Sequence, residues 1–217
     1  MPRPRQPLLS QERIVEAALA LLDAEGLDAV STRRLAAELG VSGPSLYNHV
    51  ATKDELLDAV ADTVLGEVDL SMFAGLAPGS RPGWREALHA WAHSYRASLA
   101  AHPNIIPVLA RGPGRRRPHM LRVADAVFGG LVASGWPRRE ATHVGALMRF
   151  FIIGSALASF AGGFPDDASF YTADYPHLDQ AHLLADRSRE IDESAFETGL
   201  EALLDGLEIR FAGLASG

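Results

Sequence analysis

The segment at residues 31–50 constrains the fold of this chain more than any other segment. Apolar residues recur at helical spacing from Leu35 to Leu39, and the hydroxyl of Ser31 or Thr32 can cap the first amides of that helix. Gly40 follows directly and is suited to the left-handed conformation with which many helices end. The pattern therefore predicts a short helix that ends in a glycine turn.

A second short helix is expected immediately after this turn. Ser42 is a suitable N-cap, and Pro44 in the first turn sacrifices no helical hydrogen bond. Leu46 and Val50 lie four residues apart and share the predicted buried face. This arrangement is typical of a helix-turn-helix, whose second helix enters the major groove of DNA. An ordinary helical hairpin with a polar outer face gives the same local pattern, so the flanking residues must decide.

The flanking residues predict one amphipathic helix on each side. Residues 11–25 carry apolar side chains at helical spacing, and Gly26 ends that run. Residues 52–55 (Thr-Lys-Asp-Glu) form a capping box in front of a further apolar run that starts at Leu56. The N-terminus of that helix offers free amides and Lys53 to a DNA phosphate.

Residues 10–65 resemble the DNA-binding domain of the TetR family of bacterial repressors. The matching order is a helix, Thr-Arg-x-Leu-Ala, Gly-Val, Pro-Ser-Leu-Tyr-x-His-Val and Lys-x-x-Leu-Leu. The resemblance implies phosphate contacts by Thr32, Lys53 and the Tyr47 hydroxyl, and a base or backbone contact by Arg33. The full set of positions that it assigns to DNA binding is Thr32, Arg33, Gly43, Pro44, Ser45, Tyr47, Asn48, His49 and Lys53.

One position of the predicted recognition helix departs from the family's best-known pattern. The tetracycline repressor carries a base-reading glutamine where this chain has Gly43, which has no side chain for a bidentate contact to adenine. The operator sequence therefore cannot be carried over. Arg33 is the candidate for guanine readout.

The remainder of the chain is expected to be helical, so the predicted fold class is all-α. Residues 68–83 resemble a linker, and two long apolar helices near residues 138–161 and 194–212 imply a partner surface. A symmetric homodimer through a four-helix interface satisfies both helices. The expected domains are a flexible basic arm, a helix-turn-helix domain with three helices, and a larger effector-binding and dimerisation domain, at residues 1–9, 10–66 and 67–217.

The C-terminal region resembles, more weakly, the ligand-binding domain of the tetracycline repressor subgroup. The matches include Trp84, Ser94-x-Arg96, His102 and a closing segment at residues 196–208. The positions that the resemblance assigns to the effector are Trp91, Tyr95, Leu109, Val127 and Phe150. Leu109 stands where the subgroup has a metal-ligating histidine, which favours an apolar or aromatic effector oriented by the Tyr95 hydroxyl. The alternative is that these residues only fill the core.

Composition limits the remaining possibilities. The net charge is −7, yet residues 1–53 are balanced with six basic and six acidic side chains, and the acidity gathers in residues 162–194. The absence of cysteine fits a reducing cytoplasm, and no apolar run is long enough to span a membrane. The basic loop at residues 112–118 is interpreted as a solvated turn.

No spacing in the chain supports catalysis, and no cofactor or metal site is expected. His89 and His93 are four residues apart and could share a metal ion, but no acidic residue accompanies them in a metalloprotease pattern. They are interpreted as a surface pair. The expected function is a repressor that binds a palindromic double-stranded operator as a homodimer and is released by a small molecule. The alternative is a helical protein that binds or sequesters a ligand without regulating genes.

Overall fold

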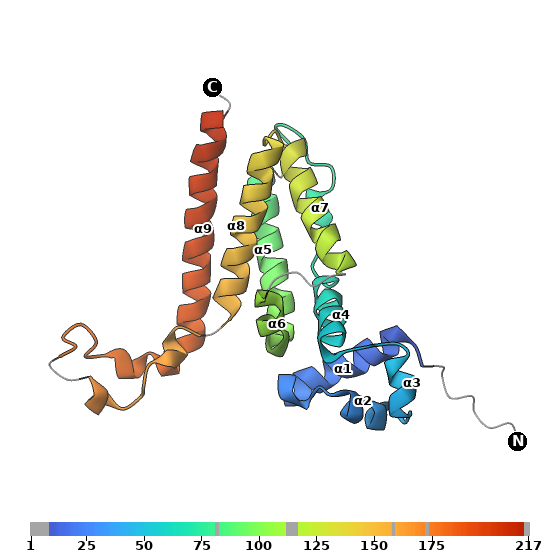
Figure 1. The fold of residues 1–217 in the computed structure, drawn as a ribbon. Helices are drawn as coiled ribbons and strands as arrows, with labels where there is room; N and C mark the ends of the chain where they lie inside the picture. The colour runs from blue at the N-terminus through green and yellow to red at the C-terminus, as the bar shows by residue number, and fades with distance from the viewer. Residues whose placement is uncertain (1–8, 81–82, 112–116, 158, 172–173, 215–217) are drawn as a thin grey trace, which may run out of the picture. The chain divides into compact units, whose positions relative to one another are not determined.

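The computed structural model describes residues 9–80, 83–111, 117–157, 159–171 and 174–214. All regular elements of this part of the chain are helical, as expected (Figure 1). Residues 1–8 of the expected basic arm and residues 112–116 of the basic loop lie outside the described residues. Among the described helices, none is long and apolar enough to cross a membrane.

The chain divides into two compact units, which are described separately. The first unit comprises Met1–Val68 and Ser98–Val123, and the second comprises Asp69–Ala97 and Ala124–Gly217. Two helices, α5 (Trp84–Ala101) and α7 (Pro118–Ala133), contribute residues to both units.

The first unit contains the four helices predicted for the DNA-binding region, α1 (Gln11–Glu25), α2 (Thr32–Leu39), α3 (Gly43–Tyr47) and α4 (Lys53–Leu65). Each begins at a hydroxyl side chain that accepts a hydrogen bond from the amide three residues later, at 3.1–3.3 Å. These caps are Ser10, Ser31, Ser42 and Thr52. Gly40 has φ of 66°, so the turn between α2 and α3 uses the left-handed conformation that glycine was expected to supply.

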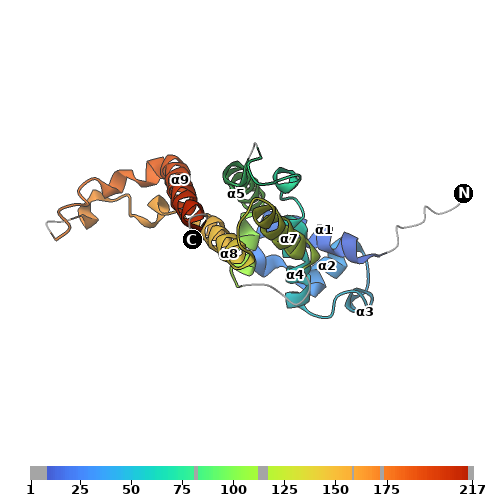
Figure 2. The same ribbon diagram turned by 90° about the horizontal axis from the view of Figure 1, so that it is seen from above.

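A small apolar core holds these helices together. α1 packs on α2 and α4, and α2 packs on α3 (Figure 2). Leu35 of α2 and Leu46 of α3 are fully buried, and Val50 after α3 is 1% exposed. Because Leu46 and Val50 point into the core, the other side of α3 faces outward.

The first unit also includes a segment from the middle of the chain. A 3₁₀ turn, Pro103–Ile105, packs on α1, and α6 (Ile106–Ala110) packs on α4. The Ser98 hydroxyl donates to the carbonyl of Val64 at 2.8 Å, and the Asn104 amide donates to the carbonyl of Leu22 at 2.9 Å. These bonds attach the segment around Ser98 and Asn104 directly to the helices of the DNA-binding region.

The second unit contains α8 (Arg138–Ala156) and α9 (Ser188–Leu214), which run side by side (Figures 1 and 2). Both helices were expected with different bounds. α8 ends before residue 161 because the chain turns there, and the amide of Phe160 donates to Asp192 at 3.1 Å. α9 begins at Ser188, before residue 194. The hydrophobic pattern did not indicate this start because the first turns are polar and carry no hydrophobic periodicity.

Within the expected linker at residues 68–83, the described residues 69–80 are more ordered than a linker. It contains a 3₁₀ turn, Ser71–Phe73, and buries Phe73 and Leu76. The ring of Phe73 approaches α7 so closely that a Cβ at Gly130 would lie 2.8 Å from it. Gly130 therefore makes this packing possible, and the segment forms part of the core of the second unit.

Candidate DNA-binding surface and effector site

The nine residues assigned to DNA binding all lie at the surface of the first unit. They come from the start of α2, from α3 and its end, and from the start of α4. The exposed ones are Arg33, Pro44, Tyr47, Asn48, His49 and Lys53, and the half-buried ones are Thr32, Gly43 and Ser45. None of them contributes to the apolar core of this unit.

A hydrogen bond joins the start of α2 to the end of α3. Thr32 Oγ1 lies 3.2 Å from the Tyr47 hydroxyl, and the Tyr47 side chain is 55% exposed. Thr32 is the first residue of α2, whose first amides have no partner within the helix. Two hydroxyl groups next to a helix N-terminus are suited to a DNA phosphate.

The three basic side chains of this surface differ in what they contact. Arg34 forms an ion pair with Glu25 at 2.7 Å, and Lys53 Nζ donates to the carbonyl of Leu27 at 3.1 Å. Arg33 is exposed and has no hydrogen-bond or ion-pair partner among the described residues. Its guanidinium is therefore free to bind a nucleotide without first breaking an internal contact.

Two of the other candidate side chains have local neighbours. Ser45 Oγ lies 2.7 Å from Ser42 Oγ, within the cap of α3, so its hydroxyl is already engaged. His49 lies near Glu12, whose pKa is lowered by hydrogen bonds from the backbone and Ser10, with a smaller effect of the His49 charge. A Cβ at Gly43 would meet no atom within 4 Å, so sterics do not exclude a side chain there.

Two of the five residues assigned to the effector lie together in an aromatic cluster on α5. Trp91 and Tyr95 are each 2% exposed, and their ring centroids are 6.0 Å apart. Phe73 packs its ring edge against Trp91 at 6.1 Å. Val127, on α7 of the same unit, is 1% exposed. Phe73 was missed from the sequence because it lies in a segment that resembles a linker.

The indole nitrogen of Trp91 is the unusual atom of this cluster. Trp91 Nε1 is buried and has no hydrogen-bond partner within the part of the chain that the structure describes. A buried donor without a partner costs about 1–3 kcal/mol. A ligand with a carbonyl or hydroxyl oxygen at this position would remove that cost.

The other two effector candidates lie on α6 and α8. Leu109 is fully buried on α6, in the first unit. Phe150 is 68% exposed and lies on α8 one turn from Leu147, which is also exposed. An effector contact by Phe150 therefore stays a prediction.

A buried polar cluster in the first unit connects α4 to the start of α7. The carboxylate of Asp62, on α4, accepts the amides of His119 and Met120, each at 3.1 Å. One turn earlier, Asp58 forms an ion pair with Arg117, whose side chain is 2% exposed. The start of α7 is thus fixed to α4 by charge-assisted hydrogen bonds.

Comparison with known proteins decides the family. The sequence pattern described as "Bacterial regulatory proteins, tetR family" matches residues 14–60, and the pattern "Tetracyclin repressor-like, C-terminal domain" matches residues 77–211. The chain belongs to the TetR family. It is therefore a DNA-binding transcriptional regulator.

Individual TetR-family proteins are similar over nearly the whole chain. An HTH-type transcriptional regulator of Saccharopolyspora erythraea is 35% identical over 88% of this chain and 74% of its own length. The class A tetracycline repressor from transposon 1721 in Escherichia coli is 32% identical over 93% of this chain and 92% of its own. The crystal structure of Streptomyces coelicolor ActR with (S)-DNPA is 32% identical, with a TM-score of 0.74, over 95% of this chain and 99% of its own.

TetR-family regulators bind operator DNA as dimers, and the second unit exposes an apolar face that fits this role. It includes Leu147 and Phe150 on α8 and Leu157 at the C-terminal end of that helix, and on α9 Ile209 is 76% exposed. A Cβ at Gly206 would meet nothing within 4 Å, so a neighbouring helix has room to approach α9. These residues fall within the two ranges expected for dimerisation.

Proposed function

We propose that this chain is a repressor that binds a palindromic operator as a homodimer and leaves it when a small apolar or aromatic molecule binds. The observation that carries the proposal is the free guanidinium of Arg33 beside the Thr32–Tyr47 pair, at the start of the helix-turn-helix. Dimerisation through α8 and α9 presents two such surfaces to DNA. The functional division that we infer is a basic arm, a DNA-binding domain and an effector domain at residues 1–9, 10–66 and 67–217.

The contacts of α4 support a route from the effector to DNA. α6 packs on α4, and the start of α7 is bonded to α4 through Asp58 and Asp62. A movement of these segments on effector binding would move α4 with them. We infer that this movement changes the spacing of the two recognition helices in the dimer, and that the operator is then bound less tightly.

The aromatic cluster of Trp91, Tyr95 and Phe73 supports a planar aromatic ligand that carries an oxygen acceptor. ActR was crystallised with (S)-DNPA and also with actinorhodin, in a structure 31% identical to this chain with a TM-score of 0.75. In this chain Trp91, Tyr95 and Phe73 offer aromatic surface, and Trp91 Nε1 offers a buried donor. We propose that this nitrogen donates to a carbonyl of the effector. Leu109 provides no metal ligand, so a magnesium–tetracycline complex is not the expected effector.

The first prediction concerns release of DNA by such a ligand. Actinorhodin, used as a probe among planar aromatic compounds, should displace the full-length protein from fluorescently labelled operator, measured by anisotropy. Trp91→Phe keeps an aromatic ring but removes the donor. It should raise the concentration for half release about tenfold, because one hydrogen bond to the ligand contributes about 1–1.5 kcal/mol.

Trp136→Phe is the matched control. Trp136 is also buried, and its Nε1 also has no partner among the described residues, but its ring packs against Trp84 and Phe211 instead. Its replacement should leave the release curve unchanged. If Trp91→Phe and Trp136→Phe both release the operator at the same actinorhodin concentration as the unaltered protein, the assignment of Trp91 to the effector is wrong. If only tetracycline with magnesium releases the operator, the proposed effector class is wrong.

The proposed function also includes the cellular location of the protein and the absence of a catalytic role. Similar proteins are transcriptional regulators, and among the described helices none suits a membrane span. We infer that the protein acts in the cytoplasm and that it regulates genes rather than catalysing a reaction.

A further inference from the structure

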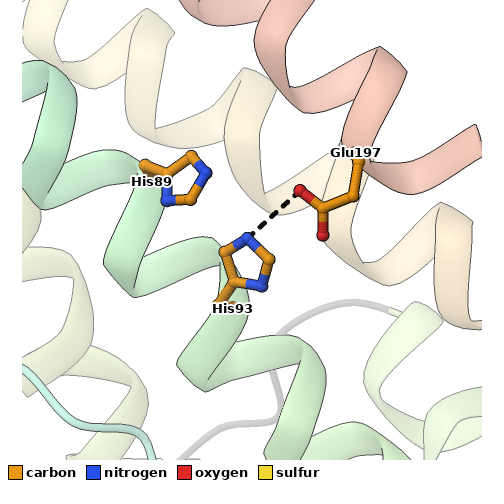
Figure 3. A group of neighbouring side chains, drawn as sticks. All are labelled: His89, His93 and Glu197. Atoms are coloured by element: carbon orange, nitrogen blue, oxygen red, sulfur yellow. Dashed lines mark ion pairs between the residues drawn. The ribbon is translucent and has the colours of Figure 1, made fainter. Parts of the chain in front are cut away.

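Two histidines of α5 face two glutamates of α9 in the second unit. His89 and His93 lie one turn apart on α5, and Glu197 and Glu201 lie one turn apart on α9, so each pair occupies one helix face. His93 Nε2 is 3.4 Å from Glu197, and His89 Nε2 is 3.4 Å from Glu201. Figure 3 shows the two imidazoles on the same side of α5, with Glu197 opposite them. The carboxylates that the sequence around the histidines lacks thus come from α9.

These distances suit a shared metal ion better than hydrogen bonds. An N–H···O bond has a donor–acceptor distance of about 2.7–3.2 Å. The side chains of His89, His93 and Glu197 make no hydrogen bond with any residue that the structure describes. Ligand atoms around a tetrahedral Zn²⁺ ion are about 3.3 Å apart, given Zn–N bonds of about 2.0–2.1 Å. The 3.4 Å separation between His93 Nε2 and Glu197 is close to this value.

Neighbouring contacts fix the two helices around the four side chains. Arg85 binds Glu201 and Asp205, each at 2.7 Å, one turn from His89. Beyond His93, Phe196 contacts the His93 ring at a centroid distance of 5.6 Å. The guanidinium of Arg96 lies over the ring of Phe196 at 4.4 Å. Contacts next to His89 and next to His93 therefore hold the histidine face of α5 toward the glutamate face of α9.

We propose that His89, His93 and Glu197 bind a zinc ion, with water in the remaining position. One ligand atom from each residue lies within 4.8 Å of the others, so small side-chain rotations bring all three to bonding distance. Their side chains are 41–48% exposed, which leaves room for those rotations and for water. Two imidazoles and one carboxylate suit Zn²⁺, whereas Mg²⁺ prefers oxygen ligands only.

The bound ion links α5 to α9. The three ligands meet only in the folded chain, because the histidines and Glu197 are far apart in the sequence. Zinc therefore binds the native state in preference to the unfolded state and stabilises it. This effect needs neither DNA nor the effector, so it stands apart from the proposed regulatory function.

Calorimetric titration of the full-length, tag-free protein with zinc chloride tests the proposal, after treatment with a chelator. We expect one ion per protomer, a dissociation constant in the micromolar range or below, and a rise of several degrees in the Tm. His89→Gln and His93→Gln should each weaken binding at least about tenfold, since each removes one ligand. Magnesium chloride should give no binding.

His143→Gln is the matched control, because His143 lies on α8 and its side chain is 58% exposed. It should bind zinc like the unaltered protein. Glu197→Gln changes an exposed side chain and provides a variant whose metal-free Tm should stay unchanged. Absence of binding by the unaltered protein would overturn the proposal, and so would unchanged binding by His89→Gln, His93→Gln and Glu197→Gln.

Discussion

Arg33→Ala should abolish tight operator binding while leaving the protein folded. The guanidinium is exposed and has no partner among the described residues, so its removal exposes no buried group. A bidentate contact to guanine contributes about 1–3 kcal/mol, and a dimer makes it twice. The dissociation constant for the operator should therefore rise at least about 30-fold, measured by anisotropy at fixed salt concentration.

Arg34→Ala is the control for this variant. Arg34 is the next residue along α2 and is also exposed, but it is paired with Glu25. Its loss should change operator affinity less than about threefold. Arg33→Lys separates two roles of Arg33, since lysine retains a phosphate contact but not a bidentate contact to guanine. Operator affinity of Arg33→Ala equal to that of the unaltered protein would remove Arg33 from the DNA-binding surface.

Among the variants proposed for this protein, Asp58→Ala should lower the free energy of unfolding most. It leaves the guanidinium of Arg117, whose side chain is 2% exposed, without its ion-pair partner. Two other nitrogens of that guanidinium, Nε and Nη1, are already buried without partners among the described residues. Breaking a buried ion pair from one side costs about 3–5 kcal/mol. Because Asp58 is 31% exposed, we expect about 3 kcal/mol in the free energy of unfolding by urea.

The double variant Asp58→Ala, Arg117→Met tests whether the unpaired charge of Arg117 causes the loss of stability in Asp58→Ala. It removes the buried charge together with its partner, so most of the lost stability should return. Glu193→Ala breaks an exposed pair with Arg189 and should change stability by less than about 0.5 kcal/mol. All variants must be compared at one protein concentration because the dimer contributes to stability. A double variant as unstable as Asp58→Ala would show that the buried charge is not responsible.

The DNA-binding region could be predicted almost completely because its signals are local. Ser31, Ser42 and Thr52 each cap a helix that starts at the next residue, and Gly40 has the expected positive φ. Such signals depend on residues within a few positions along the chain. The family resemblance added the expected DNA-facing positions, and the structure places all of them at the surface.

The missed features depend on residues that are distant in the sequence. Arg117 is buried because Asp58 reaches it from α4, and no local pattern near either residue predicts that contact. Phe73 is buried because Gly130 leaves space on α7. His93 faces Glu197 because α5 and α9 are neighbours in the fold. Hydrophobic periodicity predicts which face of a helix is buried, but not which residues of another element it will meet.

Selection of random double-stranded DNA by the purified full-length protein shows directly whether a dimer of this protein recognises a palindromic operator. Two recognition helices related by a two-fold axis require an inverted repeat, with half-sites about one helical turn apart. We expect enrichment of such a repeat and, for Arg33→Ala, loss of preference at one guanine in each half-site. Enrichment of no sequence, or of one without two-fold symmetry, would contradict it.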